Sequence, residues 1–169
     1  MKIYYREKSG GIEILRCFGI EGRVEIPGMI DGKLVISAAP YAFSSHMDEK
    51  EDLKNASLWE VSDGLEFGRE EHVLAGNDVE EIVFPYTLKE IGRYIFYGCG
   101  NLKKLEFSDS LMQIGCGAFT GCHALEKLTV HMRQGKKSGV KEMLGEMWQR
   151  IDVNFLYEYE ERCFQRNLL

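Results

Sequence analysis

A 23-residue period dominates the middle of this 169-residue sequence. Residues 79–101 read VEEIVFPYTLKEIGRYIFYGCGN, residues 102–124 read LKKLEFSDSLMQIGCGAFTGCHA, and residues 125–132, LEKLTVHM, open a third copy. The first two copies align without a gap and share seven identical residues. A fixed period of this length is typical of a solenoid, in which each copy buries its apolar face against the next copy. We therefore predict a single solenoid domain over residues 1–169, with regular repeats at 79–132.

Each copy holds two short extended segments and a compact turn. The motif L-x-x-L-x-F at 102–107 is a strand signature, and alternation sends the intervening Lys104 and Glu106 to the opposite, solvent-facing side. A second extended piece follows at 111–114, and A-F-x-G-C at 118–122 is read as a turn that returns to the core. The predicted fold class is an α/β-solenoid that is mostly β. The expected repeat core is Ile82, Phe84, Leu88, Ile91, Phe96, Cys99, Leu105, Phe107, Leu111, Ile114, Phe119 and Cys122.

The outward residues of the repeats form the candidate binding surface. Parallel strands stack about 4.8 Å apart, so equivalent residues of successive coils line up in ladders. Concave solenoid surfaces of this kind suit protein partners. The two outward ladders are expected to be Glu81, Lys104 and Lys127, and Val83, Glu106 and Thr129.

The segments before the repeats are predicted to form a cap, an irregular coil and an insertion. Residues 1–23 hold two β-prone runs around a Gly-containing loop, which predicts a β-hairpin cap. Residues 24–44 repeat the V-x-I-P and A-F motifs with extra residues between them, which predicts an irregular first coil. Residues 45–78 lose the period and are expected to be an insertion, with a helix at 47–56 and a short strand near 65–67. Such an excursion is either a binding loop or a solvated, variable one.

The last segment, residues 133–169, is predicted to be a helical cap. Apolar residues recur from Val140 to Tyr159 at mostly i+3 and i+4 spacing, which favours an amphipathic helix or helix pair; Gly145 and residues 152–154 are its weak points. A helix laid over the last coil would cover its apolar end, or it would dock on a partner. A homo-oligomer formed through this helix or through an exposed sheet edge is the alternative to a protein-binding scaffold. Its contact would be Trp148, Phe155, Leu156 and Tyr159.

Composition narrows the function and the location. The net charge is −6 and the pI is about 5.3, and no basic cluster stands out, so binding to nucleic acid is not expected. No apolar run approaches the roughly 20 residues that cross a bilayer, so membrane insertion is not expected either. As written, the sequence shows no secretory h-region, which predicts a cytoplasmic protein; a leader missing from the sequence would make it a surface or secreted one.

The five cysteines suggest structure rather than chemistry. An odd count without a leader favours reduced thiols, and Cys99 and Cys122 are expected to form a buried, reduced ladder rather than a disulfide. The spacing of Cys116, Cys122, His123 and His131 matches no zinc motif, so no metal and no cofactor are predicted. No nucleophile elbow, phosphate loop or dinucleotide fingerprint occurs. We predict that the protein has no catalytic residues and is not an enzyme.

The repeat resembles the BspA-like, or Treponema pallidum type, leucine-rich repeat. Its pattern, roughly L-x-x-I-x-[FI]-P-x-x-[VL]-x-x-I-G-x-x-A-F-x-x-C, is matched twice, with Ile95 in place of Ala and Ser108 in place of Pro. Residues 12–43 are similar to the opening segment of such proteins, except for Ala38 in place of Ile. The resemblance implies a curved, right-handed solenoid without catalytic residues, from bacterial proteins used in adhesion and protein binding. We expect a non-catalytic scaffold whose protein partner is unknown.

Overall fold

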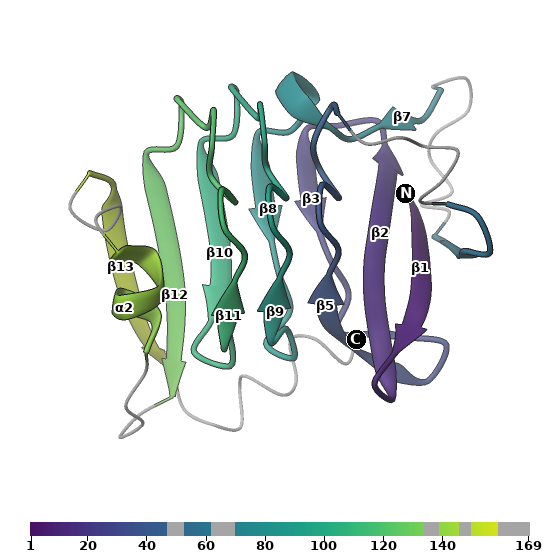
Figure 1. Cartoon of the computed structure of the whole chain (residues 1–169), viewed down its shortest axis with the longest axis horizontal. Coiled ribbons are helices and arrows are strands. Elements are labelled where there is room, and N and C mark those ends of the chain that lie inside the picture. The colour runs from purple at the N-terminus through teal and green to yellow at the C-terminus, as the bar shows by residue number, and fades with distance from the viewer. Residues whose placement is uncertain (47–52, 62–69, 134–138, 146–149, 159–169) are drawn as a thin grey trace.

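The 23-residue period of the sequence is also the geometric period of the fold. In the computed structural model, which describes residues 1–46, 53–61, 70–133, 139–145 and 150–158, three strands lie side by side and parallel: β8 (Glu81–Val83), β10 (Lys104–Ser108) and β12 (Lys127–Arg133). Lys104 pairs in register with Glu81 on one side and Lys127 on the other. The second extended pieces, β9 (Glu90–Ile91) and β11 (Gln113–Ile114), pair in the same way on the opposite side of each coil (Figure 1). The predicted mostly β solenoid is confirmed.

The irregular first coil stacks on the regular ones. β3 (Arg23–Glu25) runs parallel to β8, with Val24 opposite Ile82. β5 (Lys33–Ala38) runs parallel to β9, with Ala38 opposite Ile91. The extra residues of this coil form a small hairpin, in which β4 (Met29–Ile30) pairs antiparallel with the start of β5.

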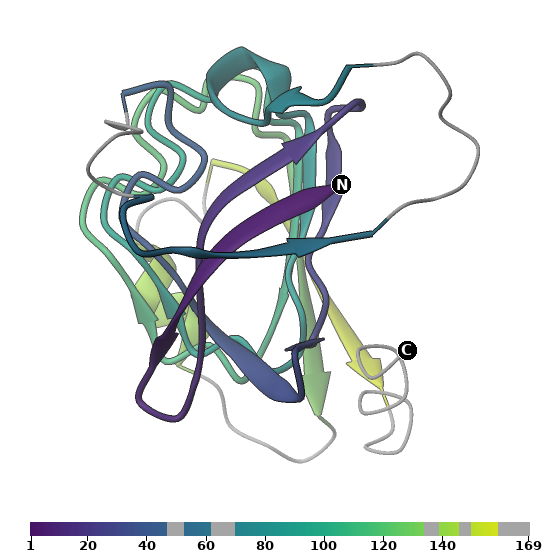
Figure 2. The same cartoon turned by 90° about the vertical axis from the view of Figure 1, so that its right-hand side faces the viewer.

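An antiparallel hairpin closes the N-terminal end of the stack, as the sequence predicts. Its strands are β1 (Lys2–Lys8) and β2 (Gly11–Gly19), and β2 continues one sheet by pairing parallel with β5. Seen from that end, β1 and β2 cross the mouth of the coils diagonally (Figure 2).

Two buried charged side chains fasten the hairpin to the coils. Arg16 of β2 donates through Nη1 to three backbone oxygens of the first-coil turn, those of residues 41, 42 and 44, at 3.0, 3.1 and 2.7 Å. Glu13, only 2% exposed, accepts from Ser37 Oγ of β5 at 3.2 Å, and within the hairpin from Arg6 Nε at 2.6 Å and Lys8 Nζ at 3.1 Å. Lys8 Nζ also donates to Glu90 Oε2 at 2.9 Å, so it links the hairpin to the second coil. Buried polar groups satisfied in this way fix one relative orientation of the parts.

The excursion at 45–78 folds back on the hairpin. β6 (Ser57–Glu60) pairs antiparallel with β1, and β7 (His72–Val73) pairs antiparallel with β2 (Figure 2). A 3₁₀ turn, η1 (Gly76–Asp78), then leads into the regular repeats. Most of the helix predicted at 47–56 and the strand predicted near 65–67 lie outside the described residues; the described residues 53–55 form a turn. The described part of the excursion therefore adds two strands, β6 and β7, to the hairpin that closes the N-terminal end of the solenoid.

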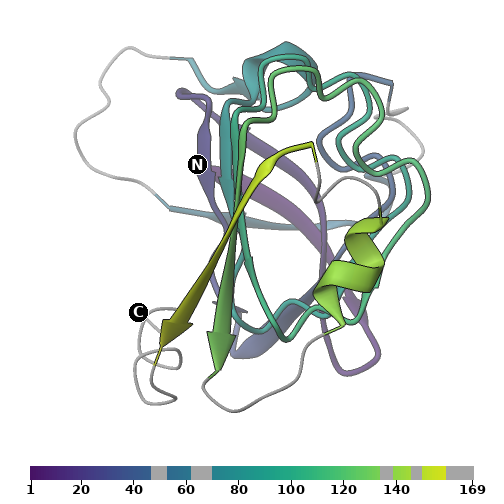
Figure 3. The same cartoon turned by 90° about the vertical axis from the view of Figure 1, so that its left-hand side faces the viewer.

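Over the described residues of the segment 133–169 (133, 139–145 and 150–158), the predicted helical cap is found only in part; Trp148 and Tyr159 of its predicted contact lie outside the described residues. The helix there, α2, spans only Val140–Leu144 and ends at Gly145, one of the two expected weak points. The other weak point opens a strand, β13 (Asp152–Glu158), which pairs parallel with β12, Asp152 opposite Lys127 (Figure 3). Val153 and Phe155 alternate as a strand requires, and the edge of β12 supplies the backbone hydrogen-bond partners that a strand, unlike a helix, cannot supply for itself. The C-terminal segment therefore adds another coil strand.

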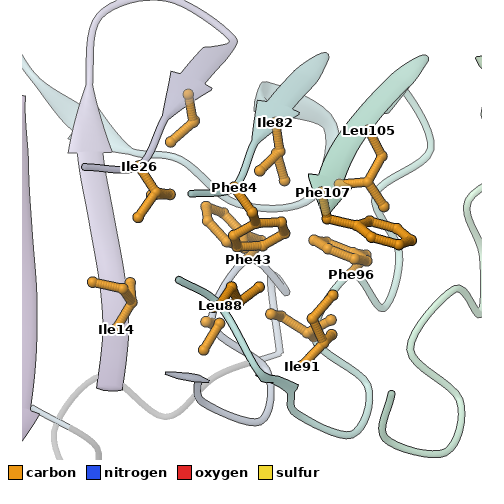
Figure 4. Close-up of a cluster of buried hydrophobic side chains, with 14 of the residues drawn as sticks. Ile14, Ile26, Phe43, Ile82, Phe84, Leu88, Ile91, Phe96, Leu105 and Phe107 are labelled. Atoms are coloured by element: carbon orange, nitrogen blue, oxygen red, sulfur yellow. The ribbon is translucent and has the colours of Figure 1, made fainter. Parts of the chain in front are cut away.

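The core fills the space between two sheets, one of five strands in the order β13-β12-β10-β8-β3 and one of eight strands that contains β11, β9, β5, β2, β1 and β6. Three phenylalanines of equivalent turns stack along the solenoid: Phe43 on Phe96 and Phe96 on Phe119, with ring centroids 6.0 and 5.7 Å apart. Figure 4 shows Phe43 and Phe96 among aliphatic residues from both sheets. Most of the expected repeat core is buried, and Ile114, Phe119 and Cys122 are partly exposed but packed against it.

Candidate protein-interaction surface

The candidate surface is the outer face of the five-stranded sheet. Pairing in this sheet puts Glu81, Lys104 and Lys127 in one row across β8, β10 and β12, as the sequence predicts. The structure extends this row at both ends, to Arg23 on β3 and to Asp152 on β13. Sequence reasoning missed both ends; the V-x-I-P motif of the first coil would have identified Arg23.

Opposite charges along this row are partly paired. Lys104 Nζ lies 2.7 Å from Glu81 Oε1, and Arg23 Nη1 lies 3.6 Å from Glu81 Oε2. Lys127 is exposed, and no carboxylate of the described chain lies within 4 Å of its ammonium group. Exposed pairs contribute only about 0–1 kcal/mol to stability, so these charges remain available to a partner.

The second predicted row differs from expectation at one residue. Val83, Glu106 and Thr129 line up as predicted, but Thr129 is only 6% exposed. Its short side chain lies between Glu106 and Asn154, its neighbours on the two adjacent strands. Thr129 therefore contributes little surface to a partner.

An acid–base cluster that sequence reasoning missed lies at the end of this row. His131 follows Thr129 on the same side of β12, is 6% exposed, and places Nε2 2.9 Å from Glu106 Oε2. The ring of Tyr86 stands edge-on to the imidazole, 5.3 Å between centroids. Just beyond the end of β10, the buried carboxylate of Asp109 accepts a hydrogen bond at 3.3 Å from Nε of Arg133, the last residue of β12. Alternation along β12 predicts that His131 lies on the same side as Thr129, but the repeat pattern does not show that Glu106 and Tyr86 contact it.

Cys99 and Cys122 are free thiols, and each makes a hydrogen bond to the turn of the preceding coil; Cys99 is buried and Cys122 is partly buried. Cys99 Sγ donates to the carbonyl oxygen of Phe43, and Cys122 Sγ donates to that of Phe96, each at 3.3 Å. Burial raises the pKa of each of these two thiols to about 12. A thiol that holds its proton so firmly is a poor nucleophile, because the thiolate is the reactive form.

The described residues offer no metal centre or membrane span. They contain no group of three or more His, Cys, Asp or Glu side chains placed to hold a metal ion. His123, beside Cys122 in the sequence, is exposed while the thiol of Cys122 bonds to a core carbonyl, so the two form no catalytic pair. No helix in this part of the chain is both long and apolar enough to cross a bilayer.

A second surface feature, also missed from the sequence, is a row of aromatic rings on the turns. Tyr41 and Tyr94 occupy the same position of successive coils and stack with centroids 5.5 Å apart. Their φ angles are 59° and 51°, a conformation that bulky residues rarely adopt. Tyr97 meets Tyr94 edge-on at 6.0 Å, and His46 meets Tyr97 at 4.9 Å. These contacts connect the turns of two coils that the excursion separates in sequence.

The chain is similar to two solved structures. No curated protein sequence matches the chain. Among solved structures, a leucine rich cell surface protein from Faecalibacterium prausnitzii A2-165 is 18% identical over 77% of this chain, with a TM-score of 0.49, and this chain spans only 31% of it. The T. pallidum Leucine Rich Repeat protein is 22% identical over 91% of this chain and 79% of its own, with a TM-score of 0.37.

The family assignment rests on the repeats themselves. The family model for the BspA type leucine rich repeat region (6 copies) matches residues 70–167, which is more than half of the 169 residues. The match includes the regular coils and β13, the strand that continues them. The chain belongs to the BspA type leucine rich repeat family.

Proposed function

We propose that this chain is a non-catalytic scaffold that binds a protein partner on the outer face of its five-stranded sheet. The observation that carries the proposal is the charged row across the strands. Lys104 and Lys127 are exposed and directly opposite each other, and Glu81 and Asp152 flank them. A row with two adjacent cations at its centre suits a partner that presents carboxylates there.

The shape of the site favours binding of modest strength. The face is built from short parallel strands whose side chains are fixed in register, so little ordering is needed when a partner docks. The row spans five strands, and a partner that contacted this row alone would bury less than the roughly 800 Å² per partner of a standard interface. Exposed charges of this kind affect the association rate and its salt dependence as well as the affinity.

The test compares two matched double variants. Lys104→Glu with Lys127→Glu reverses the central cations, whereas Lys54→Glu with Lys89→Glu reverses two exposed lysines away from this sheet and makes the same change in net charge. Proteins captured from an extract by the unmodified chain are purified, and their affinity for all three forms is measured by calorimetry. We expect the first variant to bind at least about tenfold more weakly, a difference of about 1.4 kcal/mol, and the second to bind as the unmodified chain does. Equal binding by the two variants would refute the proposal.

A further inference from the structure

The two ends of the solenoid are finished differently. At the N-terminal end, β1, β2 and β6 lie across the mouth of the coils (Figure 2). At the C-terminal end, β13 pairs with β12 along one edge, and no strand of the described chain pairs with its other edge (Figure 3). An unpaired strand edge is a template for pairing with another chain.

The direction of the backbone groups on β13 follows from a single hydrogen bond. The amide of Asp152 donates to the carbonyl oxygen of Glu126 at 3.0 Å, so it points towards β12. Backbone groups alternate along a strand, so those of Asn154 and Leu156 also point towards β12. Those of Val153, Phe155 and Tyr157 point away from it, towards the unpaired edge.

Side-chain burial changes at the same strand. The inward residues of β8, β10 and β12 that are equivalent to Val153 are Ile82, Leu105 and Leu128, which are at most 1% exposed. Val153 and Phe155 are only partly buried, although they occupy the same face. Leu156 and Tyr157 are 39% and 68% exposed. β13 therefore carries an apolar inner face that the described chain covers only in part, through core contacts and through Lys141 of α2, whose Nζ lies 5.1 Å from the centroid of the Phe155 ring.

We propose that the outer edge of β13 pairs antiparallel with the same edge of a second copy, with Asn154 facing Asn154 on the two-fold axis. This register brings Val153 of each copy opposite Phe155 of the other, and Asp152 opposite Leu156. Moving the axis to Phe155 would instead bring Asp152 opposite Glu158, two acidic residues. Like charges directly opposite each other destabilise a sheet, so the Asn154 register is preferred.

A closed pair explains the geometry better than a chain of copies. The other edge of this sheet is β3, which lies at the end where the hairpin crosses the coils (Figure 2). The hairpin would obstruct the head-to-tail stacking of β13 on β3. A two-fold pair uses the same surface on both copies and closes on itself.

The decisive experiment exploits the two-fold axis. Asn154→Glu and Asn154→Lys each place two like charges against each other, so each variant alone should sediment as a monomer where the unmodified chain sediments as a dimer. Mixing the two variants places opposite charges on the axis and should restore a dimer. Gln113→Glu, on the exposed edge strand β11, is the control and should leave the dimer intact.

A backbone substitution tests the edge itself. Val153→Pro removes an amide that points away from β12 and that would donate to Phe155 of the other copy, so circular dichroism should show a folded chain while the dimer weakens at least tenfold. The proposal is overturned if the unmodified chain stays monomeric at high micromolar concentration. It is equally overturned if the dimer survives both charged variants or if their mixture stays monomeric. None of these outcomes bears on Lys104 and Lys127, so self-pairing and partner binding can fail separately.

Discussion

Phe43 stacks on Phe96 with 6.0 Å between ring centroids, although the excursion of residues 45–78 separates their coils in sequence. The chain leaves the stack after Phe43 and returns where the amide of Gly76 donates to the Phe43 carbonyl oxygen at 2.8 Å. The aromatic column is therefore continuous while the chain that supplies it is not. This continuity lets an irregular first coil serve as the foundation for the regular coils.

Truncating the middle ring of this column should cost more than truncating its last ring. Phe96 is fully buried between Phe43 and Phe119, so Phe96→Ala should destabilise the fold by about 3–5 kcal/mol. Phe119→Ala removes a partly exposed ring and should cost distinctly less. Urea unfolding of the two variants checks this order, and equal losses would contradict the difference in burial between the two rings.

A methyl group at Gly115 should be far less tolerable than one at Gly10. A Cβ at Gly115 would lie 2.2 Å from the backbone nitrogen of Arg93 on the preceding coil, so Gly115→Ala forces two coils apart and should cost about 2–4 kcal/mol. A Cβ at Gly10 meets nothing within 4 Å, so Gly10→Ala pays only for a φ of +80°, about 1–2 kcal/mol. Thermal unfolding compares them, and a milder effect at Gly115 would contradict the close approach of the coils.

Alkylation of the folded protein should separate exposed from buried thiols. Among the cysteines of the described residues, Cys116 is exposed and should react first, whereas the buried Cys17 and Cys99, and the partly exposed Cys122 whose thiol bonds to the Phe96 carbonyl oxygen, should react only when the chain unfolds. Burial raises the pKa of each of these three thiols to about 12 and so suppresses the thiolate. Peptide mapping after brief treatment with iodoacetamide at neutral pH identifies the labelled sites. Rapid modification of Cys122 would revive the idea of a reactive thiol.

Stability should fall as the solution becomes alkaline. Below about pH 8.5 the thiols are protonated in both the folded and the unfolded chain, so they add no pH dependence. Above that pH the unfolded chain releases thiol protons that the folded chain keeps up to about pH 12, so unfolding becomes easier across this window. The urea midpoint, measured from about pH 8 to about pH 10.5, should drop less in Cys99→Ala than in the unmodified chain. Identical slopes would remove Cys99 as a cause.

The repeat unit explains what could be predicted from the sequence. Leu105 lies opposite Ile82 and Leu128 because a fixed offset between identical motifs determines register, and the outward neighbours Lys104 and Lys127 follow by alternation. The strand β13 was missed because the spacing from Val140 to Tyr159 fits a helix as well as Val153 and Phe155 fit a strand. Local periodicity cannot choose between them; the edge of β12 does.

The remaining misses share one cause, which is partners that are distant in sequence. β6 and β7 are strands because β1 and β2 offer them edges, and nothing in residues 57–60 or 72–73 announces those edges. Thr129 was expected at the surface because alternation shows which side of the sheet a residue faces, but not whether longer side chains on the adjacent strands cover it. Glu106 of β10 contacts His131 of the adjacent strand β12 diagonally, and this contact can be predicted only when the register of the two strands is known.

The contacts of Arg16 with the turn at residues 41–44 restrict how this protein can evolve in length. They tie the N-terminal hairpin to the first coil, so a duplicated 23-residue unit cannot be inserted between the hairpin and that coil without breaking these hydrogen bonds. Repeats added by tandem duplication must therefore follow the first coil in the sequence. Related proteins that gain or lose repeats would then share the hairpin and the first coil and differ only in the length of the solenoid.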